Sequence, residues 1–102
     1  MKTDKIFITI KHLSDYSGLS NIKVGDTLRL NKDLDNPYDD EAIAVYDKDN
    51  IKVGYVANST DTVARGTCSA GRIYDIIKEK INCKVVFIIT DVLIAQLLVK
   101  RA

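Results

Sequence analysis

The chain has 102 residues, of which 46% are apolar and 28% charged. This mixture is typical of one globular domain with a modest core and not of a disordered chain, so we expect a single domain over residues 1–102. A net charge of +1 provides no global basic field, which argues against tight non-specific binding to duplex DNA but leaves room for a local basic patch.

Cysteine and histidine usage limits the possible metal chemistry. Cys68, Cys83 and the lone His12 form no CxxC or HxxxH pair, so we expect no metal and no cofactor. Residues 1–5 precede no long apolar stretch, which argues against a secretory signal. We therefore expect a cytoplasmic protein with reduced thiols, although the sequence leaves a disulfide open.

Alternating apolar residues predict strands in the first half of the chain. Isoleucines at every second position indicate a strand over 6–11, and alternating leucines indicate another over 25–31. The intervening residues 12–22 are rich in Ser, Asp, Gly and Asn, which predicts a loop. Residues 31–41 are dense in Asp and Asn and contain the one proline, so they predict a second loop.

A hairpin follows this second loop. Residues 42–47 and 51–56 are apolar runs separated by Lys48-Asp49-Asn50, and Asp and Asn between two such runs are typical of a tight turn.

The next segment carries helix-end signals. Asn58, with Asp61 three residues later, predicts the start of a short helix that Gly66 ends. Ser69 is expected to cap a second helix extending to Lys80, because its isoleucines recur at helical spacing.

The C-terminal part predicts strands. Residues 82–89 are rich in β-branched side chains. Residues 91–102 are ambiguous, since Asp91 could cap a helix while the apolar run after it also fits a buried strand; we predict a strand. The apolar stretch 85–99 is too short to cross a bilayer, so we assign it to the core and expect no membrane association.

One composite pattern is more informative than the individual elements. Asn36-Pro37-Tyr38-Asp39 precedes Ala42-Ile43-Ala44-Val45-Tyr46, and Gly54-Tyr55-Val56 follows on the next predicted strand. In this order and spacing the pattern resembles the HIRAN family of small β-modules, most clearly over 24–58. The resemblance implies a mainly β fold, an OB-like or SH3-like barrel of about six strands with one or two short helices inserted before the last strands.

The resemblance also implies a function for the loop. In HIRAN modules of eukaryotic remodelling helicases, the equivalent loop holds the 3′ end of single-stranded DNA. By this resemblance, Asn36 and Tyr38 pack on the terminal nucleotides and Asp39 contacts the 3′ hydroxyl group.

The residues alone leave two interpretations of this loop open. In one, Pro37 and an Asx-turn at Asn36 make a stiff bend, and Tyr38 covers the barrel edge. In the other, Tyr38 is a platform on which a base stacks, and Asp39 accepts a hydrogen bond from a sugar hydroxyl. Because a carboxylate repels a phosphate, Asp39 suits a strand terminus with a free hydroxyl.

Further binding candidates lie outside the loop. Gly54 is expected to allow close approach of a backbone or ligand, and Tyr55 is either a second stacking platform or a core aromatic with its hydroxyl at the rim. The family often supplies a basic residue just after this strand, but residues 57–59 contain none. The candidate replacement cations are Arg29, Lys32, Lys52, Arg65 and Arg72.

Other chemistries fit the sequence less well. An EF-hand loop starting at Asp33 would need glycine at its sixth position and glutamate at its twelfth, where Tyr38 and Ala44 stand. Residues 66–72 look like a phosphate loop without the Lys-Ser/Thr ending, so a helix connector and a short anion site with Arg72 both remain open. His12 has no nucleophile at a suggestive spacing, so we expect no enzyme.

We therefore predict a non-enzymatic module that binds single-stranded DNA and prefers a 3′-hydroxyl end. Its expected role is DNA repair or processing of stalled replication forks, with a helicase or nuclease acting in trans. The alternative is a protein-interaction barrel that binds a peptide at the same cup or at a strand edge. A small enzyme built on the acidic loop is a third hypothesis, which we do not favour.

Overall fold

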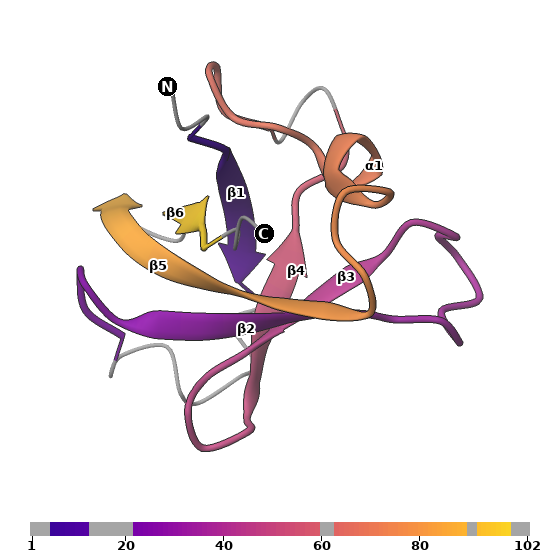
Figure 1. The fold of residues 1–102 in the computed structure, drawn as a ribbon, viewed down its shortest axis with the longest axis horizontal. Helices are drawn as coiled ribbons and strands as arrows, with labels where there is room; N and C mark the ends of the chain where they lie inside the picture. Colours follow the sequence, from indigo (N-terminus) through magenta and orange to yellow (C-terminus); the bar gives the residue numbers. More distant parts are fainter. Residues whose placement is uncertain (1–4, 13–21, 60–62, 90–91, 99–102) are drawn as a thin grey trace.

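The structure, a computed structural model of the chain, describes residues 5–12, 22–59, 63–89 and 92–98. Within them, antiparallel strands close into a barrel in the order β1-β4-β3-β2-β5-β6 (Figure 1). The mainly β barrel predicted from the sequence is thus confirmed. The strands are β1 (Phe7–His12), β2 (Thr27–Lys32), β3 (Ile43–Tyr46), β4 (Lys52–Val56), β5 (Lys80–Ile89) and β6 (Val92–Leu97).

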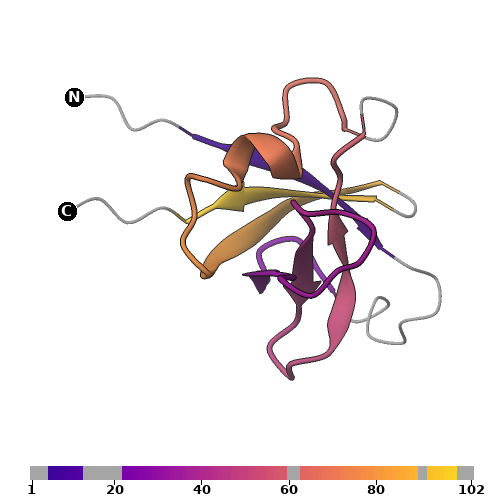
Figure 2. The same cartoon turned by 90° about the vertical axis from the view of Figure 1, so that its right-hand side faces the viewer.

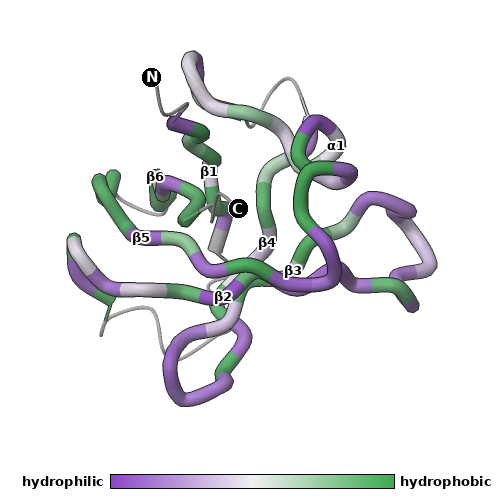
Figure 3. The backbone as a smooth tube through the Cα atoms, viewed as in Figure 1, coloured by the Kyte–Doolittle hydropathy of each residue, from purple (hydrophilic) through white to green (hydrophobic). Residues whose placement is uncertain are grey.

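The core of the barrel is formed by the alternating apolar residues from which the strands were predicted. Leu28 and Leu30 of β2 are buried while their neighbours in the strand are more exposed, and Ile8 and Ile10 of β1 are fully buried. Each such side chain contributes about 1.5–3 kcal/mol through burial. Figure 3 shows hydrophilic stretches gathered in the loops, notably around residues 33–41 and 47–50.

The β3–β4 hairpin closes with the predicted Asp/Asn turn. The Oδ1 oxygen of Asp47 accepts hydrogen bonds from the main-chain N–H groups of Asp49 and Ile51, each at 2.9 Å. Asn50 has a φ of 66°, a left-handed conformation that asparagine tolerates better than most residues. A register shift between Val45 and Tyr46 twists the strand just before this turn.

The one helix in the described residues is α1 (Ala70–Ile73), which lies outside the ring of strands (Figure 2). Ser69 caps it as predicted, since its Oγ accepts a hydrogen bond from the N–H of Arg72 at 3.2 Å. The prediction of a helix extending to Lys80 is wrong. Lys80 already belongs to β5, where it pairs with Asn31 of β2, and this long-range pairing overrides the local isoleucine periodicity.

The helix predicted between Asn58 and Gly66 lies partly outside the described residues, which omit 60–62. Its described part, 58–59 and 63–66, contains no helix. The Asn58 side chain instead caps α1, because its Oδ1 accepts a hydrogen bond from the N–H of Gly71 at 2.7 Å.

The C-terminal strand is confirmed as β6, which pairs with both β5 and β1. The rest of the predicted segment, residues 91 and 99–102, lies outside the described residues. Cys68 and Cys83 are free thiols, so they form no disulfide with each other. Among the described residues, no helix has the length and apolarity needed to cross a membrane.

Candidate functional site

The loop between β2 and β3 is held in one shape by the side chain of Asn36. Its Oδ1 accepts hydrogen bonds from the N–H groups of Tyr38 at 2.9 Å and Asp39 at 3.0 Å, which is the predicted Asx-turn. Its Nδ2 donates to Oδ2 of Asp33 at 3.3 Å. The bend that carries Tyr38 is therefore fixed by the chain itself.

Tyr38 extends from this bend into solvent. Its side chain is 95% exposed, so it covers very little of the barrel. The sequence interpretation in which Tyr38 covers the barrel edge therefore does not match the structure. A rigidly mounted, exposed aromatic ring can serve as a stacking platform.

Tyr55 lies on β4 beside the loop. Its hydroxyl donates to Oδ2 of Asp33 at 2.9 Å and accepts from Nζ of Lys52 at 3.0 Å. The side chain is half-buried, which matches an aromatic residue with its hydroxyl at the rim. Across the antiparallel ladder, Tyr55 faces Lys11 of β1.

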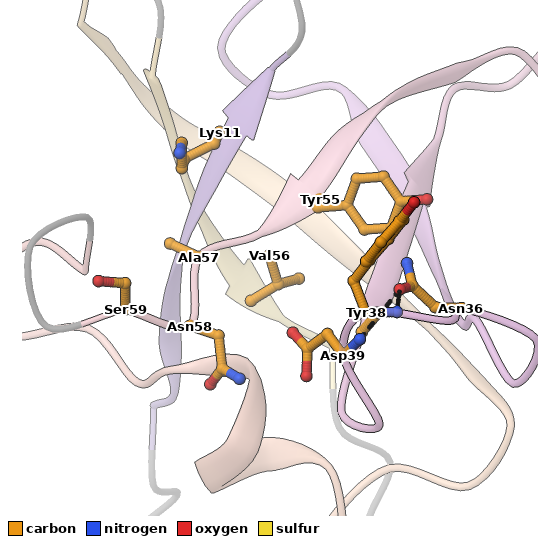
Figure 4. A pocket seen from close by; sticks show the side chains of 10 residues that line it. Lys11, Asn36, Tyr38, Asp39, Tyr55, Val56, Ala57, Asn58 and Ser59 are labelled. Atoms are coloured by element: carbon orange, nitrogen blue, oxygen red, sulfur yellow. Dashed lines mark hydrogen bonds between the residues drawn. The ribbon is translucent and has the colours of Figure 1, made fainter.

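These side chains surround a pocket of about 380 Å³, here named the Tyr38 pocket. Figure 4 shows Tyr38 and Tyr55 on one side of it, Lys11, Ala57 and Ser59 on the opposite side, and Val56 between them. The lining residues are Lys11, Asn36, Tyr38, Asp39, Ala42, Tyr55, Val56, Ala57, Asn58 and Ser59.

Among the described residues, one anion and one cation line the Tyr38 pocket. The Oδ1 oxygen of Asp39 accepts a hydrogen bond from the N–H of Glu41 at 2.9 Å. No described residue donates to its Oδ2, which leaves half of the carboxylate available to a ligand. Lys11 is exposed. The pocket therefore combines a flat ring, a carboxylate, an ammonium group and an apolar floor.

The structure separates the candidate residues into two groups. Asn36, Tyr38, Asp39 and Tyr55 meet at the Tyr38 pocket. Three other candidates, Gly54, Arg29 and Lys32, do not line it.

Each of these three candidates has another place in the fold. Gly54 is buried in β4, opposite His12 of β1 and Val45 of β3. Arg29 lies over the ring of Tyr46, with its guanidinium carbon 5.0 Å from the centroid, and it donates to Asn31 and Asn50. Nζ of Lys32 lies 4.2 Å from the centroid of Tyr74.

Lys11 lines the Tyr38 pocket but was not among the candidates predicted from the sequence. Its exposure follows from the alternation of β1, in which Ile8 and Ile10 point into the core and Lys11 points outward. Its place beside Tyr55 follows from the pairing of β1 with β4, and no local pattern reveals that pairing. Among the described residues, no group of three or more His, Cys, Asp or Glu is arranged to hold a metal ion.

Comparison with protein families identifies the module. The family model described as the HIRAN domain matches residues 4–88. The chain belongs to the HIRAN domain family. HIRAN domains are binding modules known for nucleic-acid binding and not for catalysis. Neither the curated proteins nor the solved structures provided a match. Every residue that lines the Tyr38 pocket of this HIRAN domain lies inside the matched range.

Proposed function

We propose that this HIRAN domain binds single-stranded DNA and holds a free 3′-hydroxyl end in the Tyr38 pocket. The observation that carries the proposal is the position of a fully exposed ring, Tyr38, next to Asp39, whose Oδ2 accepts no hydrogen bond from any described residue. Membership of a nucleic-acid-binding family supports the same class of ligand.

Base stacking on Tyr38 supplies affinity without sequence preference. Each base stacked on an aromatic side chain contributes about 1–3 kcal/mol. Because Asn36 already holds the bend through two main-chain N–H groups, the loop loses little conformational freedom when the base docks.

The two charges of the pocket orient the strand. The 3′ hydroxyl donates to Oδ2 of Asp39, and the preceding internucleotide phosphate meets the ammonium group of Lys11 on the opposite side. A phosphate at the 3′ end itself would face Asp39 and be repelled. With so few cations at the pocket, the affinity for single strands falls only slowly as salt rises.

Such a module would recognise strand ends in DNA repair or at stalled replication forks. It performs no chemistry itself in this proposal, and a helicase or nuclease acting in trans, in the cytoplasm, processes the end that it holds. This role extends the nucleic-acid binding of the family to one kind of end.

Fluorescence anisotropy with a labelled hexathymidylate that has a 3′ hydroxyl tests the proposal. Tyr38→Ala should weaken binding about 5- to 150-fold, the equivalent of one stacked base, while Tyr38→Phe should keep most of the affinity. Leu34→Ala is the matched control, because Leu34 is 69% exposed on the same loop and does not line the pocket. No binding by the unmodified protein, or equal loss in Tyr38→Ala and Leu34→Ala, would favour the peptide-binding alternative.

A further inference from the structure

A second pocket, of about 350 Å³, adjoins the Tyr38 pocket. Asn58 lines both, so the two hollows share one side chain as their boundary. We name the second one the arginine pocket, after Arg65 and Arg72, the charged residues among its described lining. Its lining residues are Asn58, Val63, Ala64, Arg65, Gly66, Thr67, Ser69 and Arg72.

The wall of the arginine pocket is fastened to β1 through Thr9. This threonine is 1% exposed, and its Oγ1 accepts a hydrogen bond from the N–H of Ala64 at 3.0 Å. Thr9 Oγ1 and Thr67 Oγ1 lie 2.8 Å apart, and the Thr67 hydroxyl in turn donates to the carbonyl of Ala64 at 2.7 Å. The N–H of Cys68 donates to the carbonyl of Phe7 at 2.7 Å. Residues 64–68 are therefore pre-arranged by the barrel.

The boundary between the pockets is equally well fixed. The Nδ2 group of Asn58 donates to Oε1 of Glu41 at 3.3 Å, and its Oδ1 accepts from the N–H of Gly71 at 2.7 Å. A Cβ atom at position 71 would lie 2.6 Å from Oε1 of Glu41, so only glycine allows this close approach without a shift.

The charges of the arginine pocket select an anion. Arg65 and Arg72 are exposed, and neither makes a hydrogen bond or ion pair with a described residue through its guanidinium group. None of the described residues that line this pocket is acidic, whereas Asp39 lines the neighbouring one. Guanidinium groups remain protonated at all physiological pH values and match the geometry of a phosphate.

The two pockets lie along one outer face of the same strand. Thr9 anchors the wall of the arginine pocket, and Lys11 lines the Tyr38 pocket. Residues two positions apart in a strand point to the same face, with their Cα atoms about 7 Å apart. A chain that leaves the Tyr38 pocket past Asn58 therefore enters the arginine pocket directly.

We propose that the arginine pocket is a second phosphate subsite, in which Arg65 and Arg72 hold an internucleotide phosphate of the strand whose 3′ end occupies the Tyr38 pocket. This subsite rests on the proposed function of the Tyr38 pocket. It sets the direction of the bound strand, whose 5′ portion leaves past Asn58 towards α1.

Binding measurements with two lengths of oligonucleotide test the subsite. Dithymidylate and hexathymidylate, each with a 3′ hydroxyl, are titrated against the unmodified protein and the double variant Arg65→Gln/Arg72→Gln. The double variant should bind hexathymidylate about tenfold or more weakly and dithymidylate within about twofold of the unmodified protein. Its log–log salt slope for hexathymidylate should fall by about 0.7, the value for one phosphate contact in a single strand.

The double variant Lys78→Gln/Lys84→Gln is the matched control. It also removes two exposed positive charges, and neither lysine lines either pocket. If both double variants weaken hexathymidylate binding equally, or neither does, the arginine pocket is not a subsite. Dithymidylate binding that depends on Tyr38 would then still support the proposed function. If the unmodified protein binds neither oligonucleotide, the proposed function fails, and the subsite fails with it.

Discussion

The hydroxyl group of Tyr55 donates a hydrogen bond to Oδ2 of Asp33 at 2.9 Å. Tyr55 belongs to the barrel, and Asp33 begins the loop that presents Tyr38 and Asp39, so this bond fastens the loop to the scaffold. Asn36 reaches the same carboxylate oxygen through its Nδ2. A loop that is fixed before the ligand arrives loses little entropy on binding, which favours affinity from a small contact area.

Tyr55→Phe should measure what this fastening contributes. The variant keeps the ring beside the pocket and removes the hydroxyl, so we expect the free energy of unfolding to fall by about 0.5–1.5 kcal/mol in urea denaturation. Tyr46→Phe is the control, because the Tyr46 hydroxyl has no hydrogen-bond partner among the described residues; its effect should be below about 0.5 kcal/mol. Equal stabilities of the two variants would show that the hydrogen bonds of the Tyr55 hydroxyl, to Asp33 and from Lys52, add nothing.

Gly71→Ala should reveal the close packing at the boundary between the two pockets. The new Cβ would meet Oε1 of Glu41 at 2.6 Å, and this clash opposes the gain of about 0.5–1 kcal/mol that alanine brings over glycine in a helix. We therefore expect little or no stabilisation in the unmodified background. In a Glu41→Ala background the contact with Glu41 is absent and only the 3.2 Å approach to Oδ1 of Asn58 remains, so Gly71→Ala should be more favourable than in the unmodified background. Additive effects in this double-mutant cycle would contradict the contact.

Cys83 should make stability depend on alkaline pH. Burial raises the pKa of its thiol from 9.0 to about 12, and a weaker opposing effect comes from the main chain at Leu28. Below pH 9 both folded and unfolded chains keep the proton, so this thiol causes no pH dependence there. Between pH 9 and about 12 only the unfolded chain releases it, so stability falls as pH rises, by about 1.4 kcal/mol per pH unit.

Comparison with Cys83→Ala isolates this effect from the titration of lysines and tyrosines, which both proteins share. Urea denaturation of the two proteins from pH 8 to 10.5 should give curves that diverge above pH 9, with the steeper fall in the unmodified protein. Parallel curves over that range would show that the thiol is not held in its neutral form by the fold.

Local sequence patterns were sufficient to predict most of the strands. They also predicted the part of the candidate site whose residues are adjacent in the chain. Alternating residues such as Leu28 and Leu30 predicted the strands because each residue's burial depends on its position in the pleat. Tyr38 and Asp39 were found together because they are adjacent in the chain and lie in a turn whose Asn36 signal is local.

The remaining site residues depend on which strands pair. Lys11 lies beside Tyr55 because β1 pairs with β4. The local sequence of a strand does not show which other strand it pairs with. Arg29 was a candidate binding residue because of its charge alone. The register of β2 with β3 places it opposite Tyr46 and not at the Tyr38 pocket. The helix predicted to Lys80 was too long for the same reason, since pairing with β2 takes that residue into a strand.

If the Tyr38 pocket holds a 3′ end, the Asp39 carboxylate must distinguish a free 3′ hydroxyl from a blocked end. The most direct measurement is the ratio of the Kd for hexathymidylate with a 3′ phosphate to the Kd with a 3′ hydroxyl. A hydrogen bond to a charged group contributes about 1.5–3 kcal/mol, so this ratio should be about ten or more in the unmodified protein. In Asp39→Asn it should fall towards one, because the amide repels no phosphate. A ratio of one in the unmodified protein would show that the Asp39 carboxylate does not distinguish the two ends.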